Sequence, residues 1–316
     1  MKTLQLFSRG LDTLPAQAAW MIAEISEVKG RMGKFGPHPP RRLRDLQAHA
    51  FAEAVLSSAR LAGITVRPTR AQEVLYGIAP LKEPEEEQVR GLARALSMII
   101  EQTHELDLGE SLGRDLARLV LPEGQSETGP GAAELLCLWE VERARHRVHC
   151  LVLLCAFHLD FLCALPYPDG GGRVARLLLV LQALLDGYEV VRYISLDRII
   201  LDREAAFRKA WKQSRRGWED GSHNPWPFLL FLLTCLRDAC REFGERTSGG
   251  ELPRGAKTQL VEEAIARAGD AFQLGEIVHA CPDVSYDLVR VVIKRMRAKG
   301  ELACSGRGPG SRWHKL

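Results

Sequence analysis

The sequence predicts a mainly α-helical protein, with a large all-helical domain followed by a small C-terminal module of helices and a hairpin. Apolar residues recur three or four positions apart along most of the chain, which is the period of a helix with one buried face. Convincing alternating strands are nearly absent. A polar stretch rich in Gly separates the two parts, and 316 residues are enough for each to bury its own core.

The large domain is expected to contain eight or so helices. The apolar period is clearest in residues 46–61, 89–100, 133–165 and 174–185. Gly and Pro interrupt the pattern at residues 36–40, 122–131, 166–172 and 223–227. We assign N-terminal helices to residues 1–110 and the core of this domain to residues 111–245.

Composition excludes several classes of protein. The formal net charge of +3 is too small for a polycation, so nucleic-acid binding would need local clustering of Lys and Arg. The eight cysteines form no C-x-x-C pair and are expected in the core of a reduced, cytoplasmic protein. Apolar runs such as residues 228–233 are far too short to cross a bilayer, so we expect no membrane partner.

The domain boundary is predicted at residues 246–256, which are polar and lack an apolar period. The module of residues 257–316 then reads as a helix over 258–268, a short helix over 274–280, a turn at 282–284 and a longer helix. Ser285 is the expected N-cap of the longer helix and Gly300 its C-terminal stop. Strands at 301–304 and 311–316 flank a turn at 306–310. This order predicts a winged helix-turn-helix.

The longer helix is the expected DNA-reading element. From Ser285 to the end, eight basic residues stand against two acidic ones, an excess of about six positive charges. A helix of this kind enters the major groove while wing arginines contact phosphates or the minor groove. The candidate DNA-binding residues are Ser285, Tyr286, Arg290, Lys294, Arg297, Arg307 and Arg312. The alternative is a protein-docking or dimerisation module whose charges solvate an exposed face.

A Gly-rich turn precedes the apolar helix of residues 174–185. Gly170, Gly171 and Gly172 are followed at once by Arg173, with Arg176 one turn later. Backbone N–H groups, the helix dipole and two guanidinium groups together can bind a phosphate. The alternative is a simple tight turn whose arginines pair with nearby carboxylates.

The same segment resembles the motif of the Fic family, H-P-F-x-D-G-N-G-R-x-x-R, and aligns with it without a gap over residues 165–176. Residues 157–164 resemble the H-x-x-F helix before that motif, and residues 53–64 resemble the inhibitory helix, S-x-x-x-E-G. Residues 193–198, 217–221 and 226–232 resemble the helices after the motif in Fic proteins that end in a winged helix. The resemblance implies an all-helical Fic-like domain followed by a winged helix-turn-helix.

The resemblance assigns a role to each matching position. In the family the motif histidine is the general base, the acid binds magnesium, and the glycines, asparagine and arginines hold nucleotide phosphates. Leu165 stands at the histidine position and can accept no proton, so no catalytic residue is expected there. Gly171 replaces the asparagine. The possible sites for ATP or another nucleotide are Asp169, Gly170, Gly171, Gly172, Arg173 and Arg176, with weak magnesium binding at Asp169.

Two further departures lie outside the motif. The inhibitory positions are Ser58, Ala62 and Gly63, and Ala62 stands where the glutamate that pairs with Arg176 is expected. Residues 119–131 are too short for the β-hairpin flap with which Fic enzymes dock their targets. His158 is weighed as a substitute base, but buried packing is favoured for it.

The sequence therefore predicts a catalytically degenerate protein that acts as a DNA-binding transcriptional regulator or interaction protein. We expect a homodimer on a palindromic site, because paired reading heads gain affinity through linkage. The alternative is a residual protein adenylyltransferase that uses ATP and magnesium. A third hypothesis is a pure interaction protein, such as the partner of an active enzyme.

Overall fold

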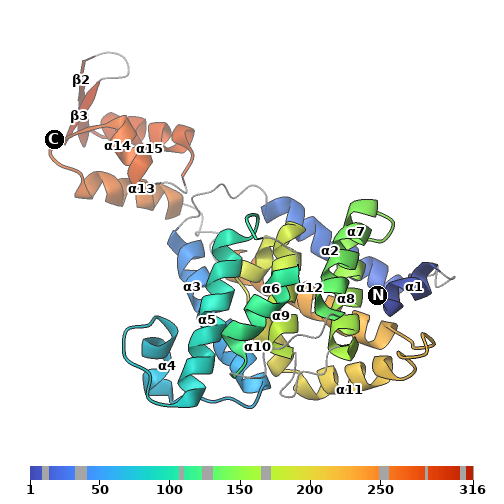
Figure 1. Ribbon diagram of the computed structural model, residues 1–316. Coiled ribbons are helices and arrows are strands. Elements are labelled where there is room, and N and C mark those ends of the chain that lie inside the picture. The colour runs from blue at the N-terminus through green and yellow to red at the C-terminus, as the bar shows by residue number, and fades with distance from the viewer. Residues whose placement is uncertain are drawn as a thin grey trace. The chain divides into compact units, whose positions relative to one another are not determined.

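The computed structural model describes residues 1–8, 14–32, 41–106, 110–122, 131–164, 172–248, 256–281, 284–306 and 311–315. The chain divides into two compact units, a first unit of Met1–Phe243 and a second unit of Gly244–Leu316. Nearly every element is a helix, and the described strands all belong to the second unit (Figure 1). The predicted mainly α-helical fold is confirmed. No helix in the described ranges is long and apolar enough to cross a membrane.

The described part of the first unit contains twelve α-helices and one 3₁₀-helix, more than the eight or so expected. The surplus consists mainly of short helices whose apolar period is too brief to recognise. In chain order the elements are α1 (Lys2–Ser8), α2 (Ala16–Met32), α3 (Arg41–Leu61), α4 (Pro68–Leu75), α5 (Pro84–Gln102), α6 (Glu110–Val120), α7 (Gly131–Arg145), α8 (Cys150–Ala164), α9 (Gly172–Leu185), η1 (Glu189–Arg192), α10 (Leu196–Leu201), α11 (Glu204–Arg215) and α12 (Trp226–Ser248), the last of which continues past the first unit.

Helices α8 and α9 form the centre of the first unit. Residues 151–161 of α8 and 173–184 of α9 are all buried, so both helices are surrounded by protein. α8 packs against α1, α7, α9 and α11, and α9 packs against α3, α5 and α6 (Figure 1). The segment that resembles the Fic motif therefore leads into the most buried helix pair of the unit.

The apolar period of residues 133–165 covers two helices. α7 ends at Arg145 and α8 begins at Cys150. His146 between them has φ 51°, a left-handed conformation that stops a helix and that no other non-glycine residue adopts in the described ranges. The apolar pattern continues across the break, so periodicity alone could not locate it.

The second unit contains α13 (Ala256–Arg267), β1 (Ala271–Gln273), α14 (Leu274–Ala280), α15 (Tyr286–Ala298), β2 (Leu302–Ser305) and β3 (Arg312–Lys315). The strands form an antiparallel sheet in the order β1-β3-β2, in which Trp313 pairs with Phe272 and with Cys304. The predicted helix-turn-helix and hairpin are confirmed. β1 was not predicted, because three residues are too few to show an alternating pattern.

Both ends of α15 form as the sequence predicts. The Ser285 hydroxyl accepts a hydrogen bond from the Leu288 N–H at 3.3 Å, which caps the N-terminus. Gly300 has φ 77°, and its N–H donates to the Arg297 carbonyl at 3.0 Å. The N–H of Glu301 donates to the Met296 carbonyl at 3.0 Å. This pair of bonds satisfies carbonyls that a helix end leaves open.

Candidate functional site

The described part of the Fic-like loop begins at α9. Gly172 and Arg173 are its first residues, and Arg176 follows one turn later. Leu165, Asp169, Gly170 and Gly171 lie outside the described residues. The structure therefore places the arginines of the candidate phosphate site.

Arg176 is buried and joins three helices. Its Nε lies 2.7 Å from Oδ1 of Asp197 on α10 and 3.2 Å from Oγ of Ser58 on α3. Its Nη2 donates to the Ser58 carbonyl at 3.0 Å. A cavity beside this network measures only about 10 Å³, which is about the volume that one water requires. Nε and Nη2 of Arg176 thus bind protein groups, and the cavity beside this network holds no more than about one water.

Burial governs the electrostatics of this pair. It lowers the pKa of Arg176, and the attraction of Asp197 offsets part of that effect. Burial likewise raises the pKa of Asp197, against the attraction of Arg176 and a hydrogen bond from Ser58. Each charge is therefore tolerated in the core because the other is present.

Arg173 is fully buried on the same helix and donates to Oε1 of Gln88 on α5 at 2.8 Å. Burial, and then repulsion from Arg176, lower its pKa to about 10. A Cβ on Gly172 would lie 2.8 Å from Nη1 of Arg176, so the glycine leaves room for that guanidinium. The start of α9 thus holds two buried cations, of which Arg176 pairs with Asp197 and Arg173 donates to Gln88.

The three inhibitory-motif positions differ in their surroundings. Ser58 is buried and bonds to Arg176, whereas Ala62 is half-buried and Gly63 ends the helix with φ 77°. Sequence reasoning missed Asp197 as the partner of Arg176. Asp197 stands in the first turn of α10, where an acid is expected to complement the helix dipole, so its position gave no reason to assign it a distant partner.

His158 is buried at the centre of α8 and stacks on Phe228, with ring centroids 5.8 Å apart. Burial, together with repulsion from Arg176, lowers its pKa to about 3. An imidazole of this kind is neutral at pH 7 and has little basicity. These features agree with a packing role for His158.

The candidate DNA-reading residues of α15 lie on its exposed side. Val289, Val292 and Ile293 are buried in the core of the second unit, as the helical period predicts. The remaining face exposes Tyr286, Val291, Arg290, Lys294 and Arg297. The Arg290 guanidinium carbon lies 5.8 Å from the centroid of the Tyr286 ring.

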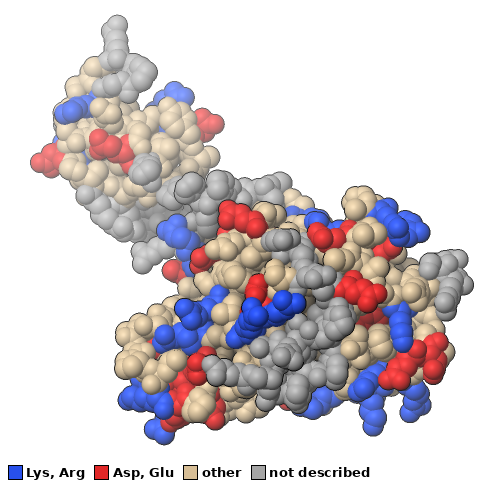
Figure 2. All heavy atoms as spheres, in the orientation of Figure 1, with Lys and Arg blue, Asp and Glu red and all other residues tan. Residues whose placement is uncertain are grey.

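Two other basic residues of the second unit have partners within it. Arg295 pairs with Glu262 of α13, and the Lys315 ammonium donates to the carbonyls of Ala266 and Ala268 at 2.8 and 2.6 Å. Arg312 is exposed at the start of β3, and Arg307 lies outside the described residues. The exposed cations of α15 therefore make up only part of the positive charge of the second unit. On the visible face of the first unit, by contrast, cations and anions are interspersed (Figure 2).

No family model matches the chain, and no curated protein matches it in sequence. Among solved structures, the chain is similar to a Fic family protein from Desulfovibrio desulfuricans G20. The two share 20% identity and a TM-score of 0.57 over 96% of this chain and 97% of that one. It is also similar to a Fic domain containing signaling protein from Bacteroides thetaiotaomicron VPI-5482, with 16% identity, a TM-score of 0.56, and coverage of 72% of this chain and 99% of that chain. The chain therefore has the Fic fold, as the resemblance of its motif implied.

Proposed function

We propose that this protein is a DNA-binding regulator, active as a homodimer in the cytoplasm, whose Fic-like domain no longer transfers AMP. The observation that carries the proposal is the exposed cationic face of α15. A helix-turn-helix places this helix in the major groove, where its outer side chains reach bases and phosphates.

The distribution of contacts on α15 supports this proposal. Arg290 and Lys294 lie one turn apart on the exposed face, and Arg297 follows at the next turn. Within the described residues, none of these three side chains forms an ion pair. Tyr286, which is 52% exposed, adds a ring that can pack on sugar or base.

The loss of AMP transfer is proposed from the motif and its surroundings. Leu165 replaces the base and Gly171 replaces the asparagine ligand. His158 is buried and has little basicity, which makes it unsuitable as a substitute base. Arg176, the arginine that should hold a phosphate, is bound by Asp197 and Ser58.

The Fic motif also defines the alternative, a residual adenylyltransferase. Incubating the full chain with radiolabelled ATP and magnesium tests it, with Asp169→Ala as the variant that removes the expected magnesium ligand. We expect no covalent label on the protein itself or on added lysate proteins. Labelling that disappears in Asp169→Ala would overturn the proposed loss of activity.

DNA binding is tested by selecting bound sequences from a random duplex pool with the full chain. We expect an enriched palindrome, because two copies of α15 related by a two-fold axis read two identical half-sites in opposite orientations. The variant Arg290→Ala/Lys294→Ala should enrich nothing. If the native chain also enriches nothing and binds no duplex at physiological salt, the second unit is a protein-docking module and the proposal fails.

A further inference from the structure

We propose that the first unit binds a small amphipathic anion, an apolar body with one carboxylate-like group, in a pocket between α1, α7, α8 and α12. The pocket has a volume of about 620 Å³, within the range of about 300–1,000 Å³ typical of small-molecule sites. It shares no lining residue with the cavity beside Arg176. The proposal is therefore independent of the Fic-like site and of DNA binding.

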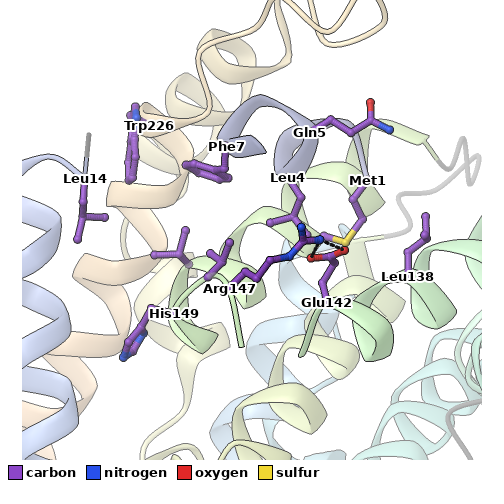
Figure 3. A pocket seen from close by; sticks show the side chains of 12 residues that line it. Met1, Leu4, Gln5, Phe7, Leu14, Leu138, Glu142, Arg147, His149 and Trp226 are labelled. Carbon is purple, nitrogen blue, oxygen red and sulfur yellow. Dashed lines mark hydrogen bonds and ion pairs between the residues drawn. The ribbon is translucent and has the colours of Figure 1, made fainter. Parts of the chain in front are cut away.

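The apolar part of the pocket comes from four helices. Its lining includes Leu4 and Phe7 of α1, Leu138 of α7 and Trp226 of α12 (Figure 3). Val152 of α8 also lines it. The Phe7 and Trp226 rings meet edge to face with centroids 5.7 Å apart. These side chains provide a surface for an aliphatic or aromatic body.

A buried hydrogen-bond network fixes one wall of the pocket. Asp160 on α8 accepts hydrogen bonds from the backbone N–H of Thr3 at 3.1 Å and from the Trp218 indole at 2.7 Å. Thr3 lies on α1, next to Leu4, so these bonds hold α1 against α8. A wall held in this way is formed before a ligand arrives, which lowers the entropic cost of binding.

The charged side chains that line the pocket are those of Arg147 and Glu142. Nη2 of Arg147 lies 3.1 and 3.2 Å from the two carboxylate oxygens of Glu142, and the Arg147 side chain extends to Glu142 beside Met1 and Leu4 (Figure 3). Arg145 also donates to Glu142, at 2.6 Å. Arg145 lies outside the pocket lining but shares Glu142 with Arg147, so this carboxylate does not fully neutralise Arg147, whose side chain is 61% exposed.

Arg147 is the group suited to an incoming anion. A guanidinium has five N–H donors in a planar fork, and the contacts with Glu142 are made through Nη2 only. The donors on Nε and Nη1 point along different edges of the group, and either of them can give a charge-assisted hydrogen bond to a carboxylate oxygen.

His149 adds a polar side chain to the pocket without adding charge at pH 7. Burial, and then repulsion from Lys29, hold its pKa below the ordinary value. Its Nδ1 accepts the Leu151 N–H at 3.2 Å, so the proton of the neutral ring resides on Nε2. The pocket therefore favours an anion over a neutral compound through Arg147, and it opposes a cation.

The test uses three probes that share one chain and differ in their head groups: octanoate, octanol and octylammonium. Isothermal titration with the full chain, below the concentrations at which the probes form micelles, should show one saturable octanoate site per chain. Octanol should bind at least about tenfold more weakly, as expected from the loss of a charge-assisted hydrogen bond. Octylammonium should show no saturable binding.

Two variants locate the site. Arg147→Gln should remove the preference for octanoate over octanol, and Leu138→Trp should weaken binding of both by filling the pocket. Arg145→Gln is the matched control, because Arg145 pairs with the same Glu142 but does not line the pocket, and it should keep the preference. Absence of saturable octanoate binding, equal affinity for octanoate and octanol, or an unchanged preference in Arg147→Gln would each overturn the proposal.

Discussion

The guanidinium of Arg176 lies 2.7 Å from the carboxylate of Asp197, and both side chains are more than nine-tenths buried. The pair connects α9, which begins at the Fic-like loop, to α10, which follows it in the chain. The arginine expected to hold a nucleotide phosphate thus has a carboxylate of the same chain as its partner. This relationship makes a structural role for Arg176 directly testable.

Asp197→Asn should destabilise the protein by about 3–5 kcal/mol, because it leaves the Arg176 charge buried without a counter-ion. The measurement is urea unfolding followed by tryptophan fluorescence. Asp202→Asn is the control, since Asp202 ends α10, is 59% exposed and pairs with Arg198. Its loss should cost less than about 1 kcal/mol. Equal effects of the two substitutions would contradict a buried ion pair.

Gly172→Ala should destabilise the protein by about 1–3 kcal/mol, because the new methyl group would lie 2.8 Å from Nη1 of Arg176. Alanine normally favours a helix over glycine by about 1 kcal/mol, so the sign is informative. Gly30→Ala in α2 is the control, because nothing lies within 4 Å of its added Cβ. It should leave stability unchanged or raise it. A stabilising Gly172→Ala would show that Arg176 does not pack there.

The protein should lose stability as the pH falls below about 6.5, in part because of His158. Its pKa is 6.5 in a model compound and about 3 in the folded protein. Between these two pH values His158 is protonated in the unfolded chain and neutral in the folded chain, so acid favours unfolding.

His158→Gln should reduce the slope of unfolding free energy against pH between 6.5 and 5 by up to the slope of one proton, about 1.4 kcal/mol per pH unit. Urea midpoints at a series of pH values measure it. His104→Gln, at an exposed position, is the matched control and should leave the slope unchanged. If both variants keep the native slope, His158 is not buried in its neutral form.

Ser285 allows capping and DNA contact to be separated. Ser285→Ala should cost about 1 kcal/mol of stability, because the Leu288 N–H loses its acceptor. Ser285→Asp should retain the cap, since Asp is an equally good N-cap. Its negative charge should nevertheless weaken duplex binding through repulsion from phosphates. Thermal unfolding and duplex titration of both variants measure the two effects. A Ser285→Asp variant that binds DNA as the native chain does would place Ser285 away from the duplex.

The sequence predicted elements whose local signals and packing agree. α15 has an apolar period, an N-cap serine and a C-terminal glycine, and all three features lead to the helix observed. The start of α9 at a Gly-rich turn was predicted for the same reason.

Features that depend on contacts between distant residues were not predicted. The pairing of Asp197 with Arg176 joins two helices, and nothing local to Asp197 indicates it. The break between α7 and α8 depends on one left-handed residue, His146, inside a continuous apolar pattern. The contacts of Lys315 with the Ala266 carbonyl and of Arg295 with Glu262 could not be predicted either, because a count of charges does not distinguish a paired cation from an exposed one.

The most direct test of the account is the salt dependence of duplex binding by the full chain. The native protein, Arg290→Ala/Lys294→Ala and the control Arg208→Ala/Lys212→Ala would each be titrated at several salt concentrations. The control pair has the same spacing on the exposed face of α11. The account predicts a steep loss of affinity with salt for the native chain and the control. The α15 variant should have a slope shallower by up to about 0.9 per phosphate contact removed. Absence of salt-dependent binding by the native chain, or equal slopes for all three proteins, would contradict DNA reading by α15.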